Sequence, residues 1–189
     1  IILKFRQAGV TELISMYCLW LAMYHPNKNI IIISINERVS KKVLRKIKYM
    51  YRNLPDHLRV DVVNGKGDEL GTASEMEFAN GSIITSVPTT EEAARSEAVS
   101  LLVIDEAAIV RWADKIWASS FPTLSTGGAA IVNSTPYGMG NWYHKTWVNA
   151  FTGGNGFNAI RLRWQMHPER DIAWHEQMAA AMGDRKSVV

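Results

Sequence analysis

Apolar residues along the chain fall into short runs of strand length, separated by segments with helical spacing. Such runs cover residues 1–4, 30–35, 101–105 and 129–133, and residues 30–35 contain five isoleucines. Apolar runs that do not alternate with polar residues are typical of strands buried on both faces of a parallel sheet. These four segments are therefore predicted to be parallel strands.

Helical spacing occupies the intervals between these runs. It is clearest over residues 37–52, where apolar residues recur every four positions, at Val39, Val43, Ile47 and Tyr51. Further helices are predicted over residues 11–24, 112–119, 141–151 and 171–182. Strands that alternate with helices imply a parallel sheet covered on both faces. The predicted fold class is α/β, with a mostly parallel central sheet flanked by helices.

Two further strands are expected outside this alternation. Asn80 and Gly81 separate residues 74–79 from residues 83–87, and Asn-Gly between two such segments is a strong signal for a tight turn. The pattern therefore predicts one inserted β-hairpin. Residues 60–63 are a shorter strand candidate.

Composition excludes several classes of protein. The 189 residues are 47% hydrophobic and 10% aromatic, which argues against disorder and is enough for one domain with its own core. No apolar stretch approaches the length of a membrane span, and no secretory signal opens the chain. The single cysteine, Cys18, excludes an internal disulfide and fits a reducing cytoplasm. Because the chain starts without Met inside an apolar run, we expect a domain cut from a longer polypeptide.

The most informative segment is the apolar run 101–104, which ends in two adjacent carboxylates, Asp105 and Glu106. A charged pair at the end of a buried strand is costly unless a ligand at the carboxyl edge of the sheet compensates it. In nucleotide hydrolases the first acid supports Mg²⁺ and the second orients a water molecule on the γ-phosphate. The alternative is a helix N-terminus, where acidic residues interact favourably with the helix dipole.

The loop after the first predicted strand suits phosphate binding. From position 4 to position 11 it reads Lys-Phe-Arg-Gln-Ala-Gly-Val-Thr, and the helix that follows directs amide groups and its dipole at an anion. Gly9 and Thr11 fit the phosphate-loop pattern G-x-x-x-x-G-K-[ST], but the first glycine is absent and Val10 replaces the lysine. Lys4 and Arg6 would supply the positive charge from upstream. A basic turn with a routine helix cap is the alternative.

A third motif follows the strand predicted at residues 129–133. It consists of Asn133-Ser134-Thr135-Pro136-Tyr137-Gly138, followed by Asn141, Tyr143 and Trp147. Hydroxyl and amide groups at Asn133, Ser134 and Thr135 would lie beside the γ-phosphate and detect its loss. An ordinary turn uses the same residue types and is the alternative.

These three motifs together resemble the ATPase domain of the large terminase subunit of tailed bacteriophages, over nearly the whole chain. The resemblance implies an ASCE-type P-loop NTPase that hydrolyses ATP with Mg²⁺ and drives double-stranded viral DNA into a procapsid. It also implies a homo-oligomeric ring on a portal protein, the small terminase subunit as a partner, and a location in the host cell cytoplasm. Neither a membrane partner nor secretion is expected.

The resemblance also implies roles for individual residues. The ATP-binding residues would be Lys4, Arg6, Gln7, Ala8, Gly9, Val10, Thr11, Asp105, Ser134 and Thr135. Thr11 and Asp105 would hold Mg²⁺, and Glu106 would be the catalytic carboxylate. Arg95 matches a family arginine that stabilises transition-state charge in its own subunit or a neighbouring one. The alternative for Arg95 is a solvated loop charge.

Two parts of the family pattern are absent from residues 1–189: the segment that contacts adenine ahead of the loop, and the nuclease domain that follows. We therefore expect an isolated P-loop ATPase domain without nuclease activity. Another DNA-translocating ATPase, such as a helicase-like motor, is one alternative. A nucleic-acid-binding module that kept the fold and lost hydrolysis is the other.

The sequence contains two weaker patterns. Residues 37–52 carry seven cations and a single acid, which fits either sequence-independent contacts with DNA phosphates or an ordinary solvated helix face. Asp171 and His175, one helical turn apart with His167 nearby, have a spacing that metal ligands use. A surface helix is favoured there, because no fourth ligand is evident.

Overall fold

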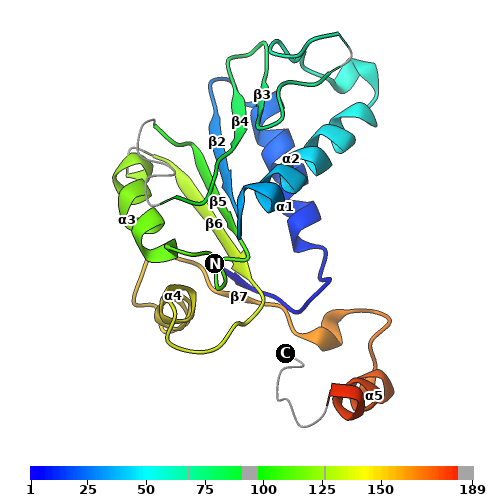
Figure 1. Cartoon of the computed structure of the whole chain (residues 1–189), viewed down its shortest axis with the longest axis vertical. Helices are drawn as coiled ribbons and strands as arrows, with labels where there is room; N and C mark the ends of the chain where they lie inside the picture. Colours follow the sequence, from blue (N-terminus) through cyan, green and yellow to red (C-terminus); the bar gives the residue numbers. More distant parts are fainter. Residues whose placement is uncertain (68, 91–97, 126, 183–189) are drawn as a thin grey trace.

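A single twisted sheet forms the centre of the protein (Figure 1). The computed structural model describes residues 1–67, 69–90, 98–125 and 127–182. Within these residues the sheet has the strand order β3-β4-β2-β5-β6-β1-β7. The strands are β1 Ile2–Leu3, β2 Asn29–Ile33, β3 Glu75–Glu77, β4 Ile83–Ser86, β5 Leu101–Asp105, β6 Ala129–Ser134 and β7 Ile160–Arg161.

Strand order brings distant parts of the chain together at one edge. All neighbouring strands are parallel except β3 and β4. Strand β6 lies between β1 and β5, with Asn133 beside Asp105 and Ser134 beside Leu3. The carboxyl ends of these three strands therefore meet, as the α/β prediction requires.

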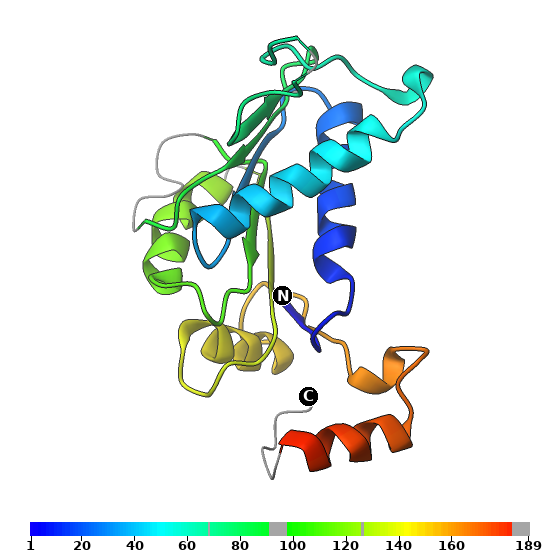
Figure 2. The ribbon, with the colours of Figure 1, turned by 45° about the vertical axis from the view of Figure 1, so that its right-hand side comes forward.

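Helices cover both faces of the sheet. The α-helices are α1 Val10–Tyr24, α2 Glu37–Arg52, α3 Ala113–Leu124, α4 Trp142–Phe151 and α5 Ile172–Met182, with short 3₁₀ helices at Asp56–Leu58 and Trp164–Met166. Helices α1 and α2 lie on one face and α3 and α4 on the other, as Figures 1 and 2 show. Helix α5 stands apart from both layers in the two views.

Alternating side chains of the central strands build the two cores. Ile30, Ile32, Leu101 and Val103 pack with α1 and α2, whereas their neighbours in the sequence pack with α3 and α4 on the opposite face. The apolar runs are continuous because both faces of these strands are buried.

Local sequence signals explain where the helices begin. The side chain of Asn36 accepts a hydrogen bond of 3.0 Å from the Val39 N–H and caps α2, and Asn141 caps α4 in the same way through the His144 N–H. Such caps satisfy amide groups that have no partner within the helix. Helix α1 instead follows Gly9, whose φ of 70° favours glycine.

The hairpin is confirmed, with its turn at Asn80 and Gly81. Its strand β4 also pairs in parallel with β2, so the hairpin extends the central sheet. The strand predicted at residues 60–63 is wrong, because this segment forms only an isolated bridge between Val62 and Phe78. Strand β7 was not predicted, since its two residues are exposed and form no apolar run.

Helix α3 is longer than predicted and runs through Pro122 to Leu124. None of the helices in the described ranges has the length and apolar character needed to cross a membrane. Cys18 is a free thiol in the core between α1 and the sheet.

Candidate active site

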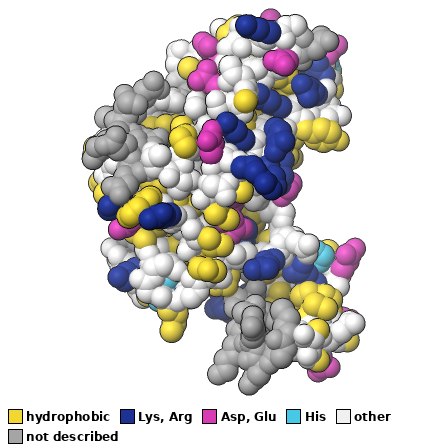
Figure 3. Space-filling view, in the orientation of Figure 1, with side chains coloured by type: hydrophobic (Ala, Val, Ile, Leu, Met, Phe, Trp, Pro, Cys, Tyr) yellow, Lys and Arg dark blue, Asp and Glu magenta, His cyan; other side chains and the backbone are white. Residues whose placement is uncertain are grey.

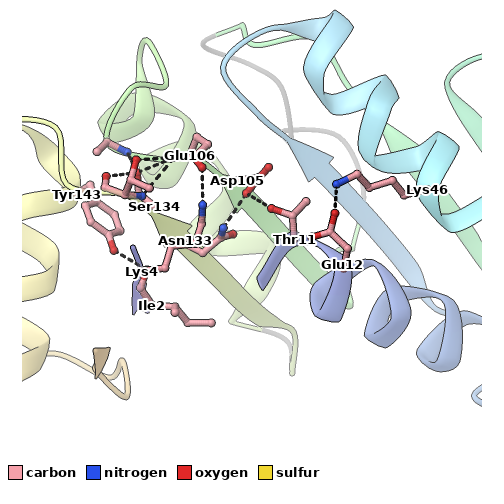
Figure 4. Close-up of polar contacts among 12 residues, drawn as sticks. Ile2, Lys4, Thr11, Glu12, Lys46, Asp105, Glu106, Asn133, Ser134 and Tyr143 are labelled. Atoms are coloured by element: carbon pink, nitrogen blue, oxygen red, sulfur yellow. Dashed lines mark hydrogen bonds and ion pairs between the residues drawn. The ribbon is translucent and has the colours of Figure 1, made fainter. Parts of the chain in front are cut away.

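The carboxyl ends of β1, β5 and β6 bring together the loop after β1, the two carboxylates after β5 and the third motif (Figure 4). The loop comprises residues 4–9 and is called the β1–α1 loop below. Figure 4 shows the Thr11 and Asn133 side chains directed at Asp105. The three sequence motifs therefore form one site, as expected from a parallel sheet.

An ion pair joins the β1–α1 loop to the end of β5. The Lys4 ammonium lies 2.5 Å from Oε1 of Glu106, and the Lys4 side chain is almost completely buried. The Lys4 N–H also donates a hydrogen bond of 3.0 Å to the Ser134 carbonyl, which extends the pairing of β1 with β6. A buried ammonium requires a partner of opposite charge, and in this structure that partner is Glu106.

The second oxygen of Glu106 faces the third motif. Both the backbone N–H and the hydroxyl of Thr135 donate to Oε2, at 3.2 and 3.1 Å. Burial alone raises the pKa of Glu106, but the Lys4 ammonium and the Thr135 donors outweigh it, so the pKa is lowered. Glu106 also has a φ of 54°. Strain of this kind in a non-glycine residue is concentrated at functional sites.

Asp105 has a different environment. It is 5% exposed, and its Oδ1 accepts hydrogen bonds from Asn133 Nδ2 at 2.7 Å and from the Thr11 hydroxyl at 3.2 Å. Burial raises the pKa of Asp105, and the hydrogen bonds from Asn133 and Thr11 offset only part of that rise. No Lys, Arg or His in the described part of the chain forms an ion pair with it. The negative charge of Asp105 is therefore incompletely compensated.

The β1–α1 loop leads directly into the amino end of α1. Gln7 and Gly9 both have positive φ angles, of 63° and 70°, and the first turn of α1 closes when the Leu13 N–H donates to the Gly9 carbonyl. The amide groups of the following residues thus lie at the start of a helix, where the dipole favours an anion. The side chains of Arg6 and Gln7 are exposed.

Comparison with known proteins agrees with this arrangement. The family described as "Terminase large subunit, T4likevirus-type, N-terminal" matches residues 1–174. The chain belongs to this family. Its match extends from β1 into α5, so all three motifs lie within the terminase domain.

Solved structures of large terminases share the fold. The ATPase domain of the large terminase of Thermus phage P74-26 superposes with a TM-score of 0.71 at 19% identity, over 97% of this chain and 83% of that one. The HK97 bacteriophage large terminase gives 0.67 at 17%, over 100% of this chain and 40% of that one. The large terminase of a thermophilic bacteriophage, in complex with ATP-gamma-S, gives 0.65 at 13%, over 94% of this chain and 43% of that one.

Two predicted site residues are buried, and a third lies outside the described residues. Val10 is buried in the core between α1 and the sheet, so only its backbone is available at the loop. The Ser134 hydroxyl is fully buried; it accepts from the Ala108 N–H and donates to the Thr135 carbonyl. Ser134 therefore supports the turn that carries Thr135. Arg95 lies outside the described residues.

One residue at the site was missed by sequence reasoning. The Arg170 guanidinium donates to the Arg6 carbonyl and to Oε1 of Gln7, both at 3.1 Å. Its motif, Trp164-x-x-His167-Pro168-x-Arg170, indicated no contact with the loop. The two segments are 164 residues apart, and no local pattern reports a contact over that separation.

The metal-ligand spacing near the C-terminus has a structural explanation. Asp171 accepts a hydrogen bond of 2.7 Å from the Trp174 N–H at the start of α5, and the His175 ring stacks on Trp164. Within the described ranges, no three His, Cys, Asp or Glu residues are grouped to hold a metal ion. A surface helix was favoured for this segment, and these contacts agree with it.

A large apolar cavity is separate from this site. It has a volume of about 1130 Å³ and is lined by residues at the amino ends of the strands, including Ile1, Leu101 and Ala129. Asp105 and Glu106 lie at the opposite ends of the strands. The carboxyl edge is the candidate active site, because the buried Asp105 and the positive φ of Glu106 are there.

Proposed function

We propose that this terminase domain binds ATP with Mg²⁺ at the carboxyl edge of the sheet and hydrolyses it to move double-stranded DNA into a procapsid. One observation carries the proposal: the β1–α1 loop and the first turn of α1 meet the two carboxylates at the end of β5, through the contacts of Lys4 with Glu106 and of Thr11 with Asp105. Phosphate-binding and acidic groups in this arrangement are what nucleotide hydrolysis requires.

Thr11 and Asp105 fit a magnesium ion. Mg²⁺ prefers oxygen ligands and is usually held by one or two protein groups together with substrate phosphates and water. The Thr11 hydroxyl and Asp105 Oδ1 are 3.2 Å apart, and burial leaves the Asp105 charge short of compensation. When bound there, Mg²⁺ would neutralise charge on the phosphate oxygens.

Lys4 and Glu106 would work in sequence. The Lys4 ammonium is paired with Glu106. The phosphates of ATP would compete for that ammonium, and Glu106 would then be free to orient the attacking water. Thr135 would keep the Glu106 carboxylate in position through its two donors. Arg6, exposed in the β1–α1 loop, would add positive charge at the phosphates.

The remaining parts of the proposal rest on the family resemblance. Arg95 would act as an arginine finger in its own subunit or a neighbouring one. The ring on a portal protein, the small terminase subunit as partner and the location in the host cytoplasm follow from the same resemblance. These parts are proposed from the resemblance alone.

Helix α2 carries a stripe of cations suited to the DNA backbone. The helix has a net charge of +6 and the whole chain only +3, so the rest of the chain is net negative. Four exposed cations lie at spacings that share one helix face: Arg38, Lys42, Arg45 and Arg52. Figure 3 shows basic side chains gathered on this side of the molecule. The stripe is about 21 Å long at 1.5 Å per residue.

The remaining cations of α2 have partners within the protein. Lys41 pairs with Glu37 and Lys46 with Glu12, and Lys48 donates to the Thr72 carbonyl. Only the exposed stripe is therefore proposed to contact DNA phosphates, which would make the contact independent of base sequence.

Phosphate release from ATP tests the proposed hydrolysis. We expect wild-type protein to release phosphate in the presence of Mg²⁺, and we expect this release to stop when EDTA is added. The Glu106→Gln variant should bind a fluorescent ADP analogue but fail to hydrolyse ATP. Equal hydrolysis by both proteins would overturn the catalytic assignment. Nucleotide binding without hydrolysis in either protein would favour the non-hydrolysing alternative.

The salt dependence of duplex binding tests the DNA surface. Replacing the four stripe cations with Gln should make the slope of log K against log salt less negative by about 3 to 4, at roughly 0.9 per phosphate contact. The matched control removes four exposed cations elsewhere: Arg111, Lys145, Arg161 and Arg163. An unchanged slope in the stripe variant, or the same change in the control, would refute this surface.

A further inference from the structure

Arg170 lies outside the sheet and forms hydrogen bonds with the β1–α1 loop. Its guanidinium donates to the backbone carbonyl of Arg6 and to the side-chain carbonyl of Gln7, both at 3.1 Å. The second of these residues, Gln7, has a positive φ of 63°. A planar guanidinium with several donors suits two acceptors at once, and a lysine does not.

Aromatic rings hold the guanidinium in place. Its central carbon lies 4.9 Å from the centre of the Phe5 ring and 4.7 Å from that of Trp174. Phe5 is a buried residue of the β1–α1 loop and also meets His167 edge to face, while Trp174 belongs to α5. Arg170 is therefore fixed between the body of the domain and α5.

Residues 163–182, called the α5 segment below, carry Arg170 and lie outside the two helix layers. Helix α5 lies beyond the sheet and its covering helices in both ribbon views (Figures 1 and 2). Ile172 and Met166 in this segment are 72% and 63% exposed. The contacts of Arg170, Phe5 and His167 thus attach the α5 segment at the loop proposed to bind phosphate.

We propose that Arg170 is a positioning residue that keeps the β1–α1 loop in its phosphate-accepting shape and transmits nucleotide occupancy of the loop to α5. The inference rests on the proposed nucleotide site and adds a residue to it. A phosphate bound at the loop shifts the Arg6 carbonyl and the Gln7 side chain. Because both are bonded to one guanidinium, the shift is passed to Trp174 and α5.

Steady-state kinetics separate this role from catalysis. The KM for ATP should rise about tenfold in Arg170→Ala, corresponding to the loss of one good contact. The kcat should stay within about threefold, because Asp105, Glu106 and Thr135 do not contact Arg170. Arg170→Lys should not restore the KM, and Arg163→Ala, an exposed arginine of the same segment, serves as the control.

Tryptophan fluorescence tests the transmission to α5. Adding ADP to wild-type protein should change the emission, and Trp174→Phe and Arg170→Ala should each remove that component. A purely structural role for Arg170 would lower thermal stability and leave the KM and the ADP-dependent signal intact. That result would overturn the inference, as would a fall in kcat at constant KM or an equal rise in KM in the Arg163→Ala control.

Failure of the proposed nucleotide site would give a different result from failure of the proposed role of Arg170. If wild-type protein neither binds ADP nor hydrolyses ATP, the proposed function itself is wrong. If wild-type protein binds ADP and Arg170→Ala binds it equally well, only the role of Arg170 is refuted. Circular dichroism of each variant confirms that the sheet is folded, which is expected because α5 lies outside both helix layers.

Discussion

The Lys4 ammonium lies 2.5 Å from Oε1 of Glu106, although the two residues are 102 positions apart in the sequence. Each neutralises a charge that would be costly to leave unpaired in a mostly buried setting. In this pair Lys4 engages the carboxylate that we propose for water activation. Nucleotide binding and activation of Glu106 would thus be linked through one lysine.

Lys4 should matter more than Arg6. We expect Lys4→Ala to lower kcat for ATP hydrolysis by about 10²- to 10³-fold, as loss of one well-placed charge stabiliser does. Arg6→Ala should have a smaller effect, because the Arg6 side chain is exposed and solvent screens its charge. Phosphate-release rates of the two variants give the comparison. A larger loss in Arg6→Ala would make Arg6 the main phosphate ligand.

The adjacent carboxylates should affect stability in opposite directions. Asp105→Asn should raise the free energy of unfolding by about 1 kcal/mol, since the amide oxygen still accepts both hydrogen bonds without a buried charge. Glu106→Gln should lower it by roughly 1 to 3 kcal/mol, because it leaves Lys4 unpaired. Urea unfolding without nucleotide or Mg²⁺ measures both values. Changes of the same sign would contradict the charge balance described for the site.

The stability differences should depend on pH. The pKa of Glu106 is below its usual value of 4.5 in the folded protein, so its stabilising contribution is complete above pH 4.5 and is lost as the pH falls through the folded value. The disadvantage of Glu106→Gln should therefore shrink on acidification. The pKa of Asp105 is above its usual value of 3.8, so the advantage of Asp105→Asn should grow as the pH rises from 3.8. Urea titrations over an acidic pH series test both trends.

Thr135 should act on kcat through its hydroxyl. Thr135→Val removes the hydroxyl donor to Oε2 of Glu106 but keeps the backbone donor. We expect kcat to fall by about 10- to 100-fold, since one hydrogen bond to a charged group contributes roughly 1.5 to 3 kcal/mol. The KM for ATP should be unchanged. Thr135→Ser is the control and should retain most of the activity, because it keeps a hydroxyl.

Cys18 should be inert in the folded protein. It is completely buried, and burial raises the pKa of its thiol to about 12. Because the thiolate is the reactive form, iodoacetamide at pH 8 should leave the native protein unmodified and alkylate it in urea. Mass spectrometry detects the adduct. Rapid alkylation of native protein would show that the core around α1 opens readily.

Local patterns predicted most of the elements correctly. The helix at residues 37–52 has the bounds that were predicted from its four-residue apolar spacing, and the Asn80-Gly81 turn lies where the hairpin was expected. The failures have local causes. Strand β7 has only two exposed residues, and the segment at residues 60–63 has one bridge partner instead of a neighbouring strand.

The site was predictable to the extent that its residues follow strand ends. Asp105 ends β5 and Glu106 follows it, and Lys4 and Thr11 flank the turn after β1, so a parallel sheet was bound to collect them. Their chemical roles stay predictions until activity is measured. Arg170 was not found, because its partners are on the first loop of the chain and nothing near Arg170 in the sequence indicates them.

By itself, the sequence determined the α/β class, the order of strands and helices along the chain, and the residue types at each strand end, because backbone preferences and burial patterns act over a few residues. Only the tertiary structure decided that β6 lies between β1 and β5, that Lys4 pairs with Glu106 and not with solvent, and that Arg170 closes on the β1–α1 loop. These contacts join residues about 100 to 160 positions apart. Such contacts depend on how the sheet packs, which no local pattern specifies.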